Sequence, residues 1–120
     1  YLTLTKGEGY GLPLLESGRC GLPVIATNWS GHLDFLDNDF LKVDYDLTAI
    51  PNEKIDNNIF VKNSKWAKVK KDSVIKQLKY SYKNYSEIKE KSKDLSKKII
   101  EKFCKKEVIK KYDKIFKEYI

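Results

Sequence analysis

Two glutamates near the start of the chain flank a short glycine-rich segment. Glu8 and Glu16 have seven residues between them, and Gly7, Gly9 and Gly11 alternate with other residues around the first of the pair. Carboxylates accept hydrogen bonds from hydroxyl groups, and glycines let a ligand approach the backbone closely. The segment therefore predicts a site for a ligand that carries hydroxyl groups and a phosphate.

The helix expected after this segment would supply the phosphate contact. Residues 12–20 predict a helix entered through Pro13, because proline fits the first helical turn. The first amides of a helix lack partners within it and carry a partial positive charge, so they suit a phosphate. Since proline has no N–H, the expected donors are Gly11, Leu12 and Leu14.

The two glutamates would fall on either side of this phosphate. Glu16 is four positions after Leu12 on the same helix face, so its carboxylate is expected about one turn, roughly 5.4 Å, behind the phosphate. A ribose attached to that phosphate would meet it. Glu8 would lie on the opposite side, beside the group that a diphosphate carries. This arrangement suits a nucleotide-sugar with one glutamate at each end.

These residues carry a resemblance to a known family. The stretch GEGYGLPLLESGRCGLPVIATNWSGHLDFL is similar to the donor-site signature of retaining glycosyltransferase family 4 enzymes, which have the GT-B fold. The tryptophan of SKWAKVKKDSVIKQL and the terminal KFCKKEVIKKYDKIFKEY are similar to the usual tail of that family. The resemblance covers nearly the whole chain.

The resemblance implies a role for each residue of the motif. Glu8 would be the catalytic residue and would bind the hydroxyls of the donor sugar, and Glu16 would bind the ribose. Residues 27–31 would lie beside the nucleotide pocket. The full donor-binding set implied in this way is Glu8, Gly9, Tyr10, Gly11, Leu12, Glu16, Thr27 and Asn28. The resemblance implies no metal ion and no cofactor, because the nucleoside-diphosphate-sugar is the donor substrate.

One part of the motif departs from the family. His32 and Asp34 stand where many members have two glycines and a later glutamate, so the contacts of this loop stay open. His32 is the only histidine, and it suits either a ligand contact or a role in filling the turn or capping a helix. Cys20 and Cys104 form no metal motif and are expected to be small buried apolar residues.

Alternating strand and helix signals predict an α/β fold with a parallel sheet. The resemblance places it as part of the Rossmann-like sheet of a GT-B C-terminal domain, with residues 1–64 binding the nucleotide-sugar and residues 65–120 forming a C-terminal helical segment. The expected strands are 1–5, 23–27 and 40–44, with a helical turn at 30–36. Residues 45–65 predict a long loop with a short strand at 58–62. Helices are expected over about 72–84, where Asp72 and Ser73 can form the cap, around 95–103 and over 108–119, with their apolar stripes facing the core.

Charge is distributed unevenly along the chain. Residues 1–60 contain four basic and nine acidic residues, a net charge of −5, whereas residues 61–120 contain 20 lysines and eight acidic residues, a net charge of +12. Lysines at helical spacing among acidic residues are typical of a solvated helix face. Binding to nucleic acid or to an anionic membrane is the alternative, and a single arginine makes bidentate reading of nucleic acid a poor fit.

The remaining features bear on context. The sequence has no methionine and opens on a strand signal, so we expect a fragment of a longer enzyme, without its N-terminal acceptor domain and inactive alone. No apolar run is long enough to span a bilayer, which favours a cytoplasmic protein. The first strand is expected to pair with 23–27 on one side only, which predicts self-association.

Two other functions compete with a retaining glycosyltransferase that transfers a sugar to a sugar, glycan or lipid. One is a related GT-B protein, such as a sugar-nucleotide epimerase or a phosphorylase. The other is a basic helical interaction module, which rests on the lysine-rich half alone. The nucleotide base, the sugar and the acceptor substrate are not readable from the residues.

Overall fold

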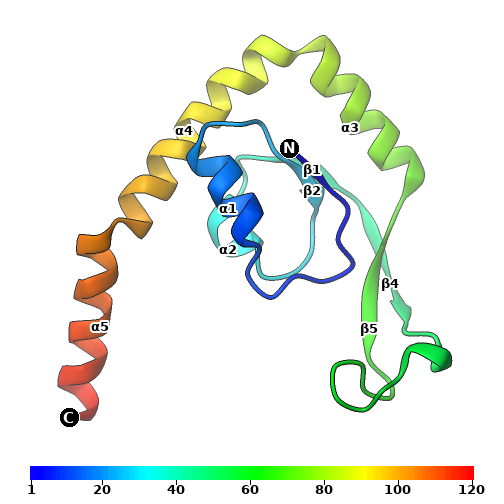
Figure 1. Cartoon of the computed structure of the whole chain (residues 1–120). Coiled ribbons are helices and arrows are strands. Elements are labelled where there is room, and N and C mark those ends of the chain that lie inside the picture. Colours follow the sequence, from blue (N-terminus) through cyan, green and yellow to red (C-terminus); the bar gives the residue numbers. More distant parts are fainter.

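A three-stranded parallel sheet forms the centre of the computed structural model, which describes all 120 residues (Figure 1). Its strands run in the order β1, β2, β3, and helices connect them, as parallel strands require. These elements are β1 (Leu2–Thr3), α1 (Leu12–Arg19), β2 (Ile25–Thr27), α2 (Leu33–Leu36) and β3 (Leu41–Val43). The α/β fold expected from the sequence is confirmed.

The main core lies between this sheet and a long later helix, α4 (Tyr85–Phe103). It is formed by eight buried apolar residues: Leu14, Val24, Ala26, Phe35, Leu36, Phe40, Leu95 and Ile99. A Cβ added to Gly18 of α1 would lie 2.8 Å from the Ile99 side chain, so the glycine lets the two helices approach. Hydroxyl groups of α4 also cap the end of α1: Ser96 donates to the Arg19 carbonyl and Ser92 to the Gly21 carbonyl.

Three helices follow the sheet, as expected, but their bounds and caps differ from the prediction. They are α3 (Lys71–Lys83), α4 (Tyr85–Phe103) and α5 (Lys105–Tyr119). No side chain caps α3, because Ser73 instead accepts a hydrogen bond from the amide of Asp44, next to β3. The expectation that every apolar stripe faces the core is wrong for α5, which contains no buried residue.

Residues 45–65 are not the long loop that the sequence predicts. An antiparallel hairpin forms instead from β4 (Tyr45–Ala49) and β5 (Lys65–Val69), with a 3-10 turn, η1 (Asn52–Lys54), and an irregular tip between them. No strand forms at residues 58–62. The hairpin was missed because turn-forming residues fill the segment between its strands, and because distant backbone helps to hold it: the Ala67 amide donates to the Lys6 carbonyl.

The chain as a whole is flat and open. Its radius of gyration is 17.1 Å, whereas a compact chain of this length has a radius of about 13.5 Å. Helices α3 and α4 form an arch over the sheet, and the hairpin and α5 extend from its two ends (Figure 1). Only 20 residues are buried, so much apolar surface stays exposed.

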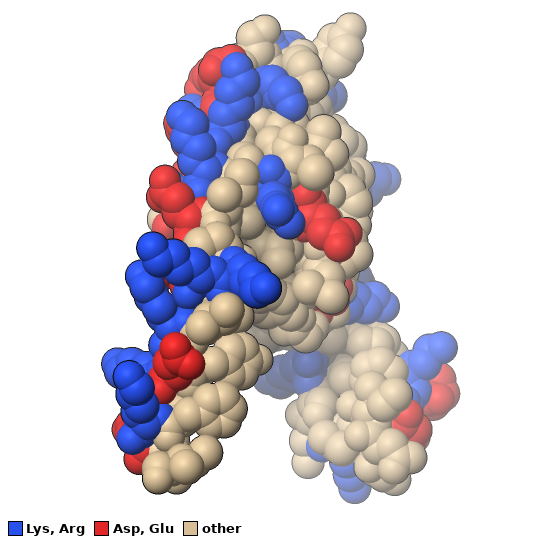
Figure 2. All heavy atoms as spheres, turned by 60° about the vertical axis from the view of Figure 1, so that its left-hand side comes forward, with Lys and Arg blue, Asp and Glu red and all other residues tan.

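Lysines cover the outer side of the arch. Figure 2 shows them along α4 and α5, with residues of other kinds on the opposite side of α5. Exposed ion pairs join Lys91 to Glu87 and Lys93 to Glu90 along α4. This agrees with a solvated helix face. No helix is both long enough and apolar enough to cross a membrane.

Candidate functional site

The glycine loop, defined here as residues 6–11, follows β1 at the carboxyl edge of the sheet. The segment of residues 28–31 follows β2 at the same edge, because the two strands are parallel. Ligands of open α/β sheets bind at this edge. The structure therefore brings residues 28–31 beside the glycine loop, and their place beside a nucleotide pocket stays a prediction.

Hydrogen bonds hold these two segments together. The Ser30 hydroxyl accepts from the Glu8 amide at 2.8 Å and donates to the Glu8 carbonyl at 2.6 Å. The Gly31 amide donates to the same carbonyl at 3.1 Å. Three bonds to one residue fix the backbone of Glu8, which the sequence singled out as the sugar-binding glutamate.

The glycines of the site fall into two kinds. A Cβ on Gly31 would lie 1.9 Å from the Gly9 carbonyl oxygen, and Gly11 has φ +85° and close contacts to Leu14. Both positions need glycine for the fold. By contrast, a Cβ on Gly7 or Gly9 would meet nothing within 4 Å, and neither has a positive φ. The protein itself gives no reason for these two glycines, and they leave the backbone open on the solvent side.

The start of α1 presents a row of free amides. Gly11 is its N-cap, no side chain caps the helix, and the amides of Gly9, Tyr10, Gly11 and Leu12 donate no hydrogen bond within the protein. The prediction that Leu14 is a donor is wrong, since its amide bonds to the Gly11 carbonyl at 3.0 Å. Four free donors and the positive end of the helix make this a candidate anion site.

The two glutamates differ in their surroundings. Glu8 is half-buried beside Gly11, with its Cγ 3.1 Å from the position of a Cβ there. Glu16 is exposed in the second turn of α1. Neither carboxylate forms an ion pair with a lysine or arginine of the chain. Both are therefore free to accept hydrogen bonds from a ligand.

Other residues of the predicted set use their side chains within the protein. The Tyr10 ring packs against Phe35 and Phe103, with centroids 5.4 and 6.4 Å away, so only its backbone faces the anion site. Burial and the nearby charge of Asp34 raise the pKa of this tyrosine. Thr27 is buried, and its hydroxyl donates to the Thr5 carbonyl at 2.9 Å.

Leu12 and Asn28 are placed differently. The Leu12 side chain is exposed, and its free amide stands at the first position of α1. The Asn28 amide donates to the Val43 carbonyl, which links the segment after β2 to β3, and its side chain is half-buried without a partner. Of Thr27 and Asn28, only Asn28 has side-chain polar atoms left for a ligand.

His32 is a structural residue of this edge. It is fully buried, and its Nε2 lies 2.7 Å from the Thr27 carbonyl oxygen, so Nε2 donates to that oxygen. Its Nδ1 has no partner, and the side chain caps no helix. Of the roles left open by the sequence, filling the turn is the one that the structure shows.

Three further expectations can be placed. Asp34 is exposed and pairs with Lys102 of α4 at 3.7 Å, so it helps to hold α2 against α4. The prediction that both cysteines are buried is wrong: Cys20 is exposed at the end of α1, and Cys104 is half-buried between α4 and α5. No group of three metal-ligating side chains occurs in the structure.

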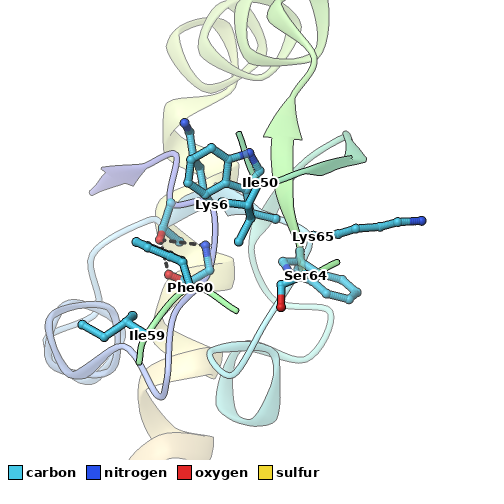
Figure 3. A pocket seen from close by; sticks show the side chains of 10 residues that line it. Lys6, Ile50, Ile59, Phe60, Ser64 and Lys65 are labelled. Carbon is cyan, nitrogen blue, oxygen red and sulfur yellow. Dashed lines mark hydrogen bonds between the residues drawn. The ribbon is translucent and has the colours of Figure 1, made fainter. Parts of the chain in front are cut away.

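Sequence reasoning missed a cavity next to the glycine loop. It measures about 570 Å³ and lies between residues 5–7 and the hairpin. Figure 3 shows Ile59 and Phe60 on one side of it and Lys6 and Ile50 on another, while Lys65 extends away. Both tryptophans of the chain line it. The sequence predicts a loop over residues 45–65, so it gives no indication of a cavity wall there.

No protein-family model, no curated protein and no solved structure matches the chain. The assignment to glycosyltransferase family 4 therefore stays an interpretation of the motif. The geometry of the site does not depend on this assignment. It consists of free backbone amides that suit an anion, with two unpaired carboxylates, Glu8 and Glu16, before and after them in the chain.

Proposed function

We propose that the chain is the donor-binding part of a retaining glycosyltransferase that transfers a sugar from a nucleoside-diphosphate-sugar to a sugar, glycan or lipid. The observation that carries the proposal is the row of four free amides between Glu8 and Glu16. Such a row suits a diphosphate, and the two carboxylates suit the hydroxyl groups at its ends.

The chemistry follows from the fixed backbone. Amides that are already oriented stabilise the negative charge that develops on the leaving diphosphate, without reorganisation at the moment of reaction. Glu8, held through its backbone by Ser30 and Gly31, orients the donor sugar over the same amides. Glu16, one turn along α1, accepts hydrogen bonds from the ribose. This scheme assigns binding and positioning to the chain.

Calorimetric titration of the chain tests the proposal. The probes are UDP, GDP and ADP and their glucose and mannose derivatives. We expect Glu16→Ala to weaken binding of the nucleoside diphosphate and of the nucleotide-sugar alike, by about tenfold or more. Glu8→Ala should weaken the nucleotide-sugar much more than the free nucleoside diphosphate.

A matched control is Glu53→Ala, an exposed glutamate in η1 outside the site. It should leave both affinities unchanged. Absence of binding by every nucleotide probe to the folded chain would reject the proposal. Equal losses for both ligands in both variants would reject the division of roles between the two glutamates.

A further inference from the structure

The cavity beside the glycine loop has the lining of a ligand site. Three aromatic residues contribute to its wall: Trp29 after β2, Phe60 at the hairpin tip and Trp66 in β5. All three are half-buried, so parts of their rings face the cavity or solvent. Aromatic walls with a few polar groups are typical of pockets for small molecules.

Apart from the Thr5 hydroxyl, the polar side chains of the cavity are donors without protein acceptors. Among the residues that line the cavity, side chain to backbone hydrogen bonds form only between the Thr5 hydroxyl and the backbone of Gly7. Figure 3 draws them as dashed lines. The Lys6 ammonium, 3.9 Å from the centroid of the Trp66 ring, has no carboxylate partner. The Ser64 hydroxyl and the indole N–H groups also make no hydrogen bond within the protein. The lining contains no acidic residue.

The wall is built before any ligand arrives. The Asp56 carboxylate accepts hydrogen bonds from the amides of Asn58, Ile59 and Phe60 at 2.8 to 2.9 Å, which fixes the hairpin tip. Phe60 then meets Trp66 edge to face, with ring centroids 5.9 Å apart. The bond from Ala67 to the Lys6 carbonyl holds the opposite wall. A preformed site loses little entropy on binding.

A sugar ring matches this set of groups. The C–H groups of a pyranose pack against the negative face of an aromatic ring, and its hydroxyls accept hydrogen bonds from ammonium, hydroxyl and indole donors. An aliphatic chain would leave those donors unpaired. The cavity is also distinct from the free amides of the glycine loop, because Gly7 lines it whereas Gly9 to Leu12 and Glu16 do not.

We propose that this cavity binds a hexose ring. The proposal rests on the aromatic wall and the free donors of the cavity, and it is independent of the function proposed above.

Tryptophan fluorescence gives a direct test, because both tryptophans of the chain line the cavity. The chain is titrated with the methyl glycosides of glucose, galactose and mannose and with glucuronic acid, each to about 100 mM. We expect a saturable change in emission with at least one of them. Phe60→Ala, which keeps both tryptophans, should lower the affinity for that sugar by about tenfold or more. Tyr82→Ala, an exposed aromatic residue on α3, is the matched control.

Further arms separate the outcomes. If Phe60→Ala lowers the melting temperature, Lys6→Met provides a second variant that removes a donor and keeps an apolar stem. Nucleoside diphosphate binding should survive in both variants. No response to any sugar, or an unchanged response in both variants, would overturn the proposal. The proposal would also be overturned if only nucleotides changed the fluorescence and Phe60→Ala abolished that change. The cavity would then bind the nucleotide base. Sugar binding without any nucleotide binding would reject the donor function and leave the hexose site standing.

Discussion

The glycine loop and the hairpin tip both line the cavity but are held in different ways. Backbone bonds to Ser30 and Gly31, and a contact that only glycine permits, hold the glycine loop. One carboxylate, Asp56, and a pair of aromatic rings hold the hairpin tip. A loop that is held by backbone contacts tolerates almost no substitution at a few positions such as Gly31. A loop that is held by side chains depends on their charge and packing, so its stability can be changed in small steps.

The largest effect is expected at Gly31. In Gly31→Ala the new Cβ would stand 1.9 Å from the Gly9 carbonyl oxygen, so the glycine loop must move and break the bonds to Glu8. We expect the free energy of unfolding to fall by about 3 kcal/mol. Urea unfolding measures it. The control is Gly7→Ala, where the added Cβ meets nothing and the change should stay within about 0.5 kcal/mol. Equal midpoints for the two variants would contradict the distinction between the glycines.

A second change separates folding from binding in the same loop. Gly9→Ala should leave stability unchanged, because its Cβ would meet no protein atom. It should still weaken binding of a nucleoside diphosphate by about tenfold, since the methyl group stands beside the free amides. Calorimetry and urea unfolding of the same variant give both values. Full affinity in a stable Gly9→Ala variant would mean that the ligand does not approach there.

The exposed edges of the two regions should also behave differently. Leu2 in β1 and Leu47 in β4 are both 44% exposed, but β1 contains no charged side chain while the hairpin carries Asp46, Lys65 and Lys68. Charged residues on a strand edge oppose pairing with another chain. We expect the chain to self-associate through β1, and Leu2→Lys to weaken this association by about fivefold, or roughly 1 kcal/mol.

Sedimentation velocity over a concentration series measures this association. Leu47→Lys removes the same kind of exposed side chain from the hairpin and should leave the association constant unchanged. A wild-type chain that remains a monomer at high concentration would show that the open edge of β1 does not mediate association.

The smallest effect concerns the pH dependence of the hairpin tip. Hydrogen bonds from the amides of Phe60, Asn58 and Ile59 lower the pKa of Asp56. The ionised Asp56 carboxylate therefore stabilises the fold above its unfolded pKa of about 3.9. This stabilisation is lost as the pH falls through the lower pKa of the folded state. We expect tryptophan emission to change in this acidic window as Phe60 leaves Trp66. Asp56→Asn keeps an uncharged oxygen acceptor and should lack that step. A step of equal size in the variant would assign it to other carboxyl groups.

Much of the sheet and of the anion site could be predicted because the signals are local. Pro13 after Gly11 marks the start of α1, and a buried-type run marks β2. The sequence also pointed to the open backbone at Gly9. It did not distinguish Gly31 from Gly9, because the sequence does not show whether a glycine packs closely against other backbone or leaves space for a ligand.

The hairpin and the caps were not predictable in the same way. Tyr45–Ala49 alternates apolar and polar residues, but its pairing with Lys65–Val69 spans an intervening segment full of turn residues. Ser73 has the sequence position of a helix cap, yet it bonds to Asp44 because β3 lies beside α3. Such choices depend on which distant donors are unpaired nearby.

The sequence by itself determined the α/β order, the helix that starts at the glycine loop and the pair of carboxylates around it. These depend on backbone preferences and periodicity, which act over a few residues. Only the tertiary structure decided that His32 is a buried residue of the turn, that Ser30 fixes Glu8, and that two tryptophans 37 positions apart line one cavity. The physical reason is that contacts between distant segments depend on how the elements pack, and packing is set by the whole chain at once.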